Sequence, residues 1–284
     1  MEGSAVRRVG CRAGLGIVAD VIDIEDPADP RVAAFRDLKS ADRRPDLPGR
    51  QGYVIAEGVV VVQRMLSSRF TPFGLLGVGR RYEELAADLT GVDVPYYRAT
   101  AEVMAEIVGF HLNRGVLAAA RRPDEAALDE ILASARTVAV LEGVNDHENI
   151  GSIFRNAAGL GADAVLFGER CADPLYRRAV RVSMGHVLRV PFARLPDWPG
   201  SLETLRDKGF QIIALTPDPA AATLARAMTG DRVALLLGAE GPGLTETAMA
   251  ATDIRARIPM TPGTDSLNVA TAAAMAFYER VRIS

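Results

Sequence analysis

Lysine is almost absent from this chain of 284 residues. Lys39 and Lys208 are its only lysines, so nearly all of the positive charge is carried by arginine. The planar guanidinium group suits bidentate contacts with phosphate, although a composition bias toward arginine codons would explain the same imbalance. The formal net charge of −3 argues against a uniformly basic nucleic-acid-binding protein. The distribution of the arginines therefore matters more than their number.

Cysteine is equally scarce. The two cysteines lie far apart and have no metal-ligand spacing to any of the three histidines; these residues are Cys11, Cys171, His111, His147 and His186. Isolated thiols of this kind are typical of a reducing compartment. The sequence therefore predicts a cytoplasmic protein with reduced cysteines and no metal site.

Long apolar runs are missing as well. No run approaches the ~18 residues that a membrane-spanning helix needs, so we expect no membrane anchor. Near the N-terminus the apolar stretch is broken by glycine and stopped at Asp20, which is unlike a signal peptide. We therefore expect residues 1–20 to form a loose extension.

Two common nucleotide-binding motifs are absent. The chain contains no G-x-x-x-x-G-K-[ST] and no G-x-G-x-x-G, and the stretch GAEGPG at 238–243 has its glycines in a different order. The first absence excludes a P-loop, and the second makes a dehydrogenase or a class I methyltransferase a poor fit.

The order of apolar segments predicts two α/β domains. Short strands and helices alternate over residues 21–122, and a helix at 123–136, with Pro123 suited to its first turn, connects them to the rest. Over residues 137–284, near-continuous apolar strands joined by helices indicate a parallel sheet covered on both faces. These strands are expected at 138–142, 164–167, 188–190, 211–215, 233–237 and 254–258.

Residues 235–279 carry the densest turn signals. A buried strand runs into the glycine-rich stretch at 238–243, where the backbone can turn without side chains in the way. A second strand ends near Ile258, and we expect Asp265 and Ser266 to open the final, alanine-rich helix as N-cap residues. The pattern predicts a site of mostly main-chain groups, although one ordinary α/β repeat would also account for it.

A second informative helix follows the strand at 138–142. We expect Asn149 to cap it, and Gly159 and Gly161 to end it. The buried face is expected at Ile150, Ile153, Phe154, Ala157 and Ala158, and a polar stripe at Asn149, Ser152, Arg155 and Asn156. A helix N-terminus beside a projecting guanidinium is suited to bind phosphate, although a solvated helix face would give the same pattern.

Three stretches occur in order along the chain. The first is NIGSIFRNAA, beginning at Asn149; the second is LLGAEGPGL, beginning at Leu236; the third is IPM at 258–260 followed by DSLNVA from Asp265. Together they resemble the motifs of the SpoU (TrmH-like) family of RNA 2′-O-ribose methyltransferases, within the SPOUT superfamily. Two weaker matches, EGVVVVQRML and GFHLNRGVL, resemble the family's substrate-binding domain, so the similarity covers nearly the whole chain after about Val21.

The resemblance implies a fold and an activity. Residues 21–122 would bind the RNA substrate, and residues 137–284 would form a SpoU methyltransferase catalytic domain whose C-terminal segment is threaded into a trefoil knot. The implied cofactor is S-adenosylmethionine, the implied reaction is methyl transfer to a ribose 2′-hydroxyl of rRNA or tRNA, and the implied assembly is a homodimer. No DNA partner is expected.

The resemblance also implies roles for individual residues. The cofactor would be held by Leu215, Thr216, Gly238, Glu240, Gly241, Ile258, Met260, Leu267 and Asn268. The catalytic set would be Asn149, Arg155, Glu240, Ser266 and Asn268. In that family, the arginine that matches Arg155 is regarded as central to activating the 2′-hydroxyl. A guanidinium is a poor proton acceptor at neutral pH, so we favour a role in binding phosphate and stabilising negative charge on the 2′-oxygen, with a phosphate oxygen or water taking the proton.

Arginines cluster over residues 177–194, a run with no acidic residue. We expect Arg177, Arg178 and Arg181 to contact RNA. A non-catalytic RNA-binding or ribosome-assembly protein on the same fold is the alternative, although all three motifs keep their polar residues. The sequence leaves open which RNA is modified.

Overall fold

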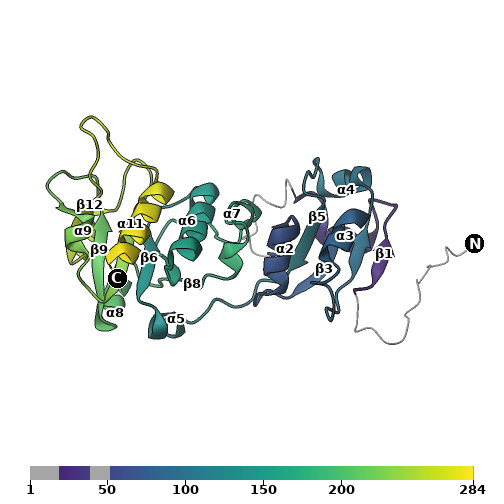
Figure 1. Cartoon of the computed structure of the whole chain (residues 1–284), viewed down its shortest axis with the longest axis horizontal. Coiled ribbons are helices and arrows are strands. Elements are labelled where there is room, and N and C mark those ends of the chain that lie inside the picture. The colour runs from purple at the N-terminus through teal and green to yellow at the C-terminus, as the bar shows by residue number, and fades with distance from the viewer. Residues whose placement is uncertain (1–18, 39–51, 284) are drawn as a thin grey trace, which may run out of the picture. The chain divides into compact units, whose positions relative to one another are not determined.

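A computed structural model describes residues 19–38 and 52–283, so nearly all of the expected N-terminal extension lies outside the described residues. The chain divides into two compact units, residues 1–122 and residues 123–284 (Figure 1). Among the described residues, no helix combines the length and the apolar character needed to cross a membrane.

The N-terminal unit contains a five-stranded sheet with the order β1-β4-β3-β5-β2. Its strands are β1 (Val21–Asp23), β2 (Val54–Glu57), β3 (Pro72–Gly77), β4 (Tyr96–Arg98) and β5 (Val116–Ala120). Strands β1, β4 and β3 run parallel, whereas β5 is antiparallel to both of its neighbours, β3 and β2. The sheet is therefore mixed.

Helices cover both faces of this sheet. The 3-10 helix η1 (Pro30–Phe35) and helix α4 (Ala101–Val108) share one hydrophobic core, in which Phe35 and Met104 join Leu76 and Leu117. Helices α2 (Val59–Leu66) and α3 (Gly79–Leu85) contact each other and the strands as well, α2 lying on β2 and β5 and α3 on β4.

The C-terminal unit contains a seven-stranded sheet with the order β10-β12-β9-β11-β6-β7-β8. Every pairing in it is parallel. The strands are β6 (Thr137–Leu141), β7 (Ala164–Phe167), β8 (Phe192–Arg194), β9 (Phe210–Leu215), β10 (Ala222–Thr223), β11 (Arg232–Leu237) and β12 (Ile254–Arg257). The α/β class and the parallel sheet predicted from the sequence are confirmed.

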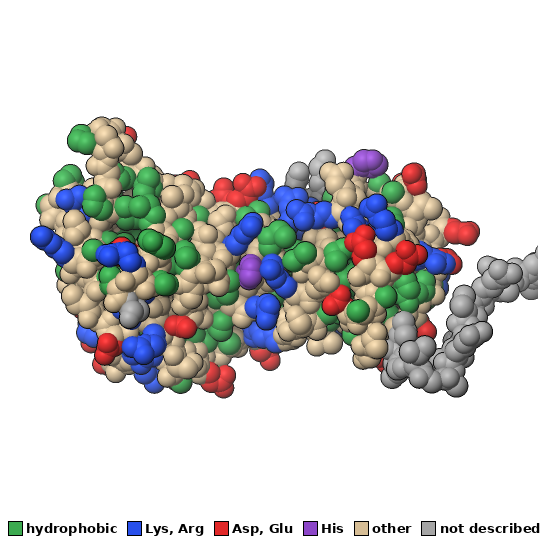
Figure 2. Space-filling view, viewed as in Figure 1, with side chains coloured by type: hydrophobic (Ala, Val, Ile, Leu, Met, Phe, Trp, Pro, Cys, Tyr) green, Lys and Arg blue, Asp and Glu red, His purple; other side chains and the backbone are tan. Residues whose placement is uncertain are grey.

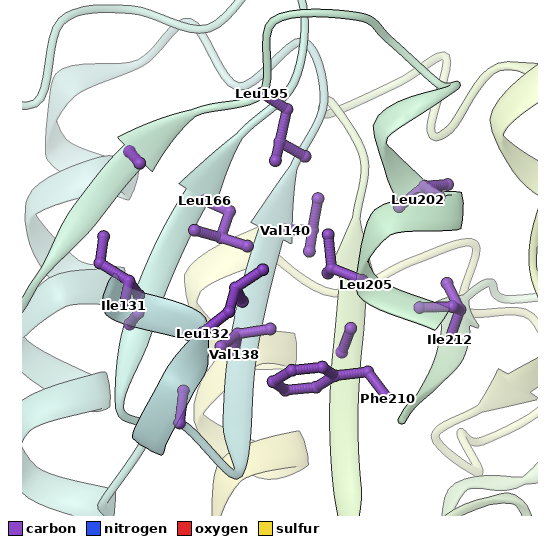
Figure 3. Close-up of a cluster of buried hydrophobic side chains, with 14 of the residues drawn as sticks. Ile131, Leu132, Val138, Val140, Leu166, Leu195, Leu202, Leu205, Phe210 and Ile212 are labelled. Carbon is purple, nitrogen blue, oxygen red and sulfur yellow. The ribbon is translucent and has the colours of Figure 1, made fainter. Parts of the chain in front are cut away.

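One face of the parallel sheet is covered by α5 (Leu128–Ser134) and α8 (Ser201–Asp207). Figure 3 shows Leu132 of α5 and Leu205 of α8 meeting alternate strand residues such as Val140 and Leu166. The helix expected at 123–136 is thus confined to α5, because residues 123–127 are not helical.

Helices α6 (His147–Leu160) and α11 (Val269–Ile283) lie side by side (Figure 1). Phe154 of α6 packs against the rings of Phe167 and Phe192, whose centroids lie 6.2 and 5.8 Å away. The remaining helices in the described part of the C-terminal unit are α7 (Arg177–Val182), η2 (His186–Leu188), α9 (Leu224–Ala227) and α10 (Glu246–Ala250).

The strand predicted at 188–190 is wrong. The chain there is a helical turn, since the Val190 N–H donates to the His186 carbonyl at 2.9 Å, and the strand of this region, β8, begins at Phe192. Gly185, with a φ of 82°, starts the turn. Val187 and Leu188 are buried by packing, and a short apolar run of this kind does not distinguish a strand from a helical turn.

Candidate functional site

Four neighbouring strands of the C-terminal unit bring predicted site residues to one edge of the sheet. Strands β12, β9, β11 and β6 are adjacent and parallel, so their carboxyl ends meet where open α/β sheets bind ligands. Leu215 and Thr216 lie at the end of β9, Gly238 follows β11 and Ile258 follows β12. The Thr216 N–H donates to the Ala256 carbonyl at 2.9 Å, which ties two of these ends together.

Residues 238–244, here called the glycine loop, fold tightly on themselves. The Gly243 N–H donates to the Ala239 carbonyl at 3.0 Å. A Cβ added at Gly238 would collide with the backbone of Gly243. Gly241 has a φ of 88°, a conformation that other residues rarely adopt, and it is exposed. The loop therefore presents main-chain groups rather than side chains.

Hydrogen bonds join one side chain from each of the three motifs. Asn149 Nδ2 donates to Glu240 Oε1 at 3.0 Å, and Asn268 Nδ2 donates to both Glu240 Oε1 and Asn149 Oδ1 at 2.8 Å. We call these three residues the Asn-Glu-Asn cluster. Asn149 is 9% exposed, whereas Glu240 and Asn268 are exposed. The cluster therefore fixes the glycine loop against the starts of α6 and α11.

Asn149 does not cap α6, contrary to the expectation from the sequence. The cap is Asp146, whose carboxylate accepts the Glu148 N–H at 2.6 Å. Aspartate and asparagine cap equally well, and here the amide of Asn149 is engaged in the cluster instead. Ala158, expected to be buried, is exposed, so the buried face of α6 is narrower than predicted.

The start of the final helix also differs from the prediction. Helix α11 begins at Val269, and Asn268 Oδ1 accepts the N–H groups of Ala270 and Thr271 at 3.0 and 3.1 Å. Asn268 thus caps the helix with its oxygen while its nitrogen serves the cluster. Asp265 and Ser266 lie before the helix in an exposed segment, because the later asparagine reaches these amides first.

Arg155 lies exposed on α6, and within the described part of the chain it has no hydrogen bond or ion pair. Its neighbour Asn156 donates to the Ala270 carbonyl at 2.9 Å, which fixes this turn of α6 against the start of α11. Ser266 is exposed and, among the described residues, is not hydrogen-bonded to the cluster. The structure therefore brings three of the five predicted catalytic residues into contact.

Three predicted cofactor residues supply apolar surface near this edge. Ile258, Met260 and Leu267 are all half-buried in the segment that joins β12 to α11. A half-buried apolar side chain can cover one face of a planar or aliphatic ligand group without closing the site.

The arginine run is less free than the sequence suggests. Arg177, Arg178 and Arg181 lie on α7, but Arg178 forms an ion pair with Glu148 of α6 at 2.6 Å. This bond raises the pKa of Arg178 above its ordinary value. Further along the run, Arg194 pairs with Glu125 at 3.4 Å. Acidic side chains from other segments thus reach the run although none occurs within it.

One residue at this edge was missed by the sequence reasoning. Glu142 follows β6 and is only 2% exposed, yet its carboxylate accepts hydrogen bonds from Thr245 and Trp198. The available signal was an acidic residue directly after the apolar run at 138–141, where a buried charge needs partners. Burial raises the pKa of the Cys171 thiol, which lowers the fraction present as thiolate.

No group of three or more metal-ligating side chains occurs in residues 19–38 and 52–283. The site therefore consists of main-chain groups, an amide-carboxylate cluster and an exposed guanidinium.

Comparison with known proteins places this chain in a family. Residues 136–278 match the model of the SpoU rRNA Methylase family. An uncharacterised tRNA/rRNA methyltransferase of Mycobacterium bovis is 65% identical over 266 residues, which cover 93% of this chain and 92% of that protein. A 23S rRNA (guanosine-2′-O-)-methyltransferase of Vibrio cholerae is 31% identical over 165 residues, covering 57% of this chain and 66% of that protein.

A solved structure supports the same placement. The AdoMet-bound rRNA methyltransferase of Sinorhizobium meliloti superposes with a TM-score of 0.75 at 25% identity, covering 93% of this chain and 98% of that one. The likeness therefore extends over both units and not only over the parallel sheet.

Proposed function

The chain belongs to the SpoU rRNA Methylase family of RNA methyltransferases, and we propose that it methylates a ribose 2′-hydroxyl of rRNA or tRNA. The Asn-Glu-Asn cluster carries this proposal, because it brings the family's three motifs together by hydrogen bonds. The 2′-O position is supported by the three motifs and by the activity for which the Vibrio cholerae relative is named.

S-adenosylmethionine is the methyl donor, and the strand-end edge fits it. The Sinorhizobium meliloti relative binds AdoMet. In this chain the glycine loop offers main-chain groups, and the crowding at Gly238 leaves no space for a side chain there. Leu215, Thr216 and Gly241 would contribute backbone, and Ile258, Met260 and Leu267 would cover the adenine. When bound, the cofactor supplies an electrophilic methyl group on a sulfonium ion.

The Asn-Glu-Asn cluster orients the site. Glu240 accepts two amide donors, so its carboxylate is held in one direction with its charge close to the site. A fixed negative charge near the cofactor position favours a cationic ligand. Preorganised polar groups of this kind need no rearrangement as the reaction proceeds.

Arg155 has no hydrogen bond or ion pair in the described part of the chain, so its guanidinium is available to bind substrate. Its guanidinium would bind an RNA phosphate in bidentate fashion and stabilise negative charge that develops on the 2′-oxygen. Ser266, exposed in the segment before α11, would orient the ribose. The proton would leave to a phosphate oxygen or to water.

The knot and the dimer belong to the same proposal. The stretch from β12 to α11 would be threaded to form the trefoil knot, and the contact of α11 with α6 supports this path. Apolar side chains gather over α11 in the C-terminal unit (Figure 2), where Met275, Tyr278 and Val281 are 43%, 59% and 54% exposed. An exposed apolar stripe on a helix is typical of a subunit interface, and we propose that it forms a homodimer.

We also propose that the N-terminal unit, residues 21–122, binds the RNA substrate, together with Arg177, Arg178 and Arg181. The ion pair of Arg178 with Glu148 is compatible with this role, because exposed ion pairs are weak and an RNA phosphate can replace the carboxylate. A cytoplasmic location fits an enzyme that acts on rRNA or tRNA.

The test is transfer of a labelled methyl group. The purified protein is incubated with labelled S-adenosylmethionine and, separately, with rRNA and tRNA from cells that lack the enzyme. We expect label in one RNA class, and digestion to nucleosides should place it on the ribose. The Arg155→Ala variant is the control for background transfer. Label on a base would contradict 2′-O-methylation, and cofactor binding without any transfer would favour a non-catalytic RNA-binding protein.

A further inference from the structure

Glu142 is a buried carboxylate that the mechanism above does not use. It lies directly after β6 and is 2% exposed. Its Oε2 accepts the Thr245 N–H at 2.8 Å, and its Oε1 accepts the Thr245 hydroxyl at 2.8 Å and Trp198 Nε1 at 2.6 Å. Arg170 Nη2 lies 4.0 Å from Oε1. A buried charge with this many donors holds its surroundings in one arrangement.

The backbone of Glu142 extends this hold to the other end of the glycine loop. Its N–H donates to the carbonyl of Leu237, the last residue of β11, at 3.0 Å. The glycine loop starts directly after Leu237 and ends directly before Thr245. One residue therefore bonds to the chain on both sides of the loop, with its main chain at the start and with its carboxylate at the end.

The glycine loop carries Glu240, which reaches Asn149 and Asn268. Any shift at the ends of the loop would displace Glu240 and the main-chain groups beside it. The backbone of Gly143, the residue after Glu142, also lies close to the glycine loop. A Cβ placed at Gly143 would be only 3.1 Å from the Ala239 Cβ. The geometry points to Glu142 as a positioning residue that preorganises the glycine loop for S-adenosylmethionine, an inference that rests on the proposed function.

Replacing Glu142 by glutamine tests the role with almost no change in volume. The amide keeps one acceptor oxygen but places an NH₂ group where the other oxygen was. Depending on its orientation, either the Thr245 N–H or the Trp198 Nε1–H loses its acceptor. A buried donor left unsatisfied is unfavourable, and the loop can relieve this by moving away from β6. We expect Glu142→Gln to bind S-adenosylmethionine roughly 10- to 100-fold more weakly by calorimetry.

A control carboxylate lies at the opposite end of β6 and, unlike Glu142, it is exposed. Asp163 Oδ2 accepts the N–H groups of Arg136 and Thr137 at 2.8 Å each, and the Asp163 N–H donates to the Thr137 carbonyl at 2.8 Å. It thus joins strand ends as Glu142 does, but away from the glycine loop. Asp163→Asn should leave the dissociation constant for S-adenosylmethionine within about twofold of wild type. This should hold even if the substitution lowers the urea midpoint of unfolding.

Trp198→Phe keeps an aromatic ring beside Gly168 and removes one donor to Glu142, so it provides a milder second variant if Glu142→Gln does not fold. We expect it to weaken cofactor binding by about 3- to 10-fold. Unchanged cofactor affinity in whichever of the two variants folds, or an equal loss in Asp163→Asn, would overturn the positioning role. A wild-type protein that fails to bind S-adenosylmethionine would instead overturn the proposed function on which the inference rests.

Discussion

In the N-terminal unit, charged side chains pair at the surface: Arg98 with Asp23, and Arg81 with Glu84. The C-terminal unit also has surface ion pairs, such as Arg178 with Glu148. In addition it buries polar side chains that bond to distant segments, as Asn149 does to Asn268. Of the buried polar side chains in the described ranges, Glu57 alone belongs to the N-terminal unit.

The direction of the strands explains this difference. In the C-terminal sheet every pairing is parallel, so the ends of β12, β9, β11 and β6 deliver loops to one edge. In the N-terminal sheet β5 is antiparallel to its neighbours, so strand ends from the middle of the sheet point both ways. A parallel sheet therefore concentrates polar loops in one place, and burial there makes each hydrogen bond matter more.

The strongest test of the comparison is Arg155→Lys, which should abolish most catalysis without touching the N-terminal unit. Lysine keeps the charge but loses the planar fork that binds phosphate. We expect the barrier of the single-turnover reaction to rise by about 2–4 kcal/mol at every pH from 7 to 10, with cofactor affinity unchanged. Rates measured with saturating RNA and cofactor check this. Recovery of the lysine variant alone toward wild type near pH 10 would support a proton-accepting role instead.

Within the C-terminal unit, Gly238→Ala and Gly241→Ala should separate crowding from backbone strain. At Gly238 a Cβ collides with the backbone of Gly243, whereas at Gly241 no atom lies within 4 Å and only the φ of 88° is unfavourable. Strain of that kind costs about 1–2 kcal/mol.

We therefore expect Gly238→Ala to weaken S-adenosylmethionine binding by at least about 100-fold, and Gly241→Ala by about tenfold or less. Calorimetric titration of both variants, with circular dichroism to confirm folding, decides between them. Equal losses would mean that the collision at Gly238 is relieved without moving the loop.

The sequence predicted the parallel sheet and the three motifs because both rest on local patterns. Apolar strand segments such as 233–237 differ by only one residue from the observed β11. The polar residues of the motifs were found, but their contacts were not, because Asn149 and Asn268 are 119 positions apart in the sequence.

Errors arose where two residues compete for one local role. Asp146 and Asn149 are both good caps, and the choice between them depends on Glu240, which is distant in sequence. Glu142 was missed because its role also depends on distant residues: its donors, Thr245 and Trp198, come from two other loops. Local preference identifies candidates, and tertiary hydrogen bonds select among them.

The arginine run tests whether surface charge in the C-terminal unit contributes to RNA binding. A triple variant should weaken RNA binding; it combines Arg177→Ala, Arg178→Ala and Arg181→Ala. The slope of log K against log salt concentration should fall in magnitude by at most ~0.7–0.9 for each phosphate that the protein no longer neutralises. Glu148→Gln should act in the opposite direction, because it frees Arg178 from its ion pair. Binding measured over a series of salt concentrations checks both signs. An unchanged salt slope in the triple variant would mean that the run reflects composition alone.

The smallest effect is expected from the surface ion pair of the N-terminal unit. Arg98 donates two hydrogen bonds to Asp23, at 2.6 and 2.8 Å, and these bonds lower the pKa of Asp23 below its ordinary value. Both side chains are substantially exposed, at 45% and 61%, so solvent screens the pair. We expect Asp23→Asn to lower the free energy of unfolding by less than about 0.5 kcal/mol at pH 7.

The pH dependence of this loss has a definite sign. Because the pKa of Asp23 is lower in the folded state than its value of ~3.9 in an unfolded chain, the pair stabilises the fold fully above that value. Its contribution disappears as the pH falls through the folded-state pKa, where the carboxylate takes up a proton. Urea unfolding of Asp23→Asn and wild type should therefore converge as the pH is lowered progressively below ~3.9, while cofactor affinity stays equal at pH 7. A loss well above 1 kcal/mol, or a change in cofactor affinity, would contradict the contrast between a screened surface pair in one unit and buried, cooperative polar contacts in the other.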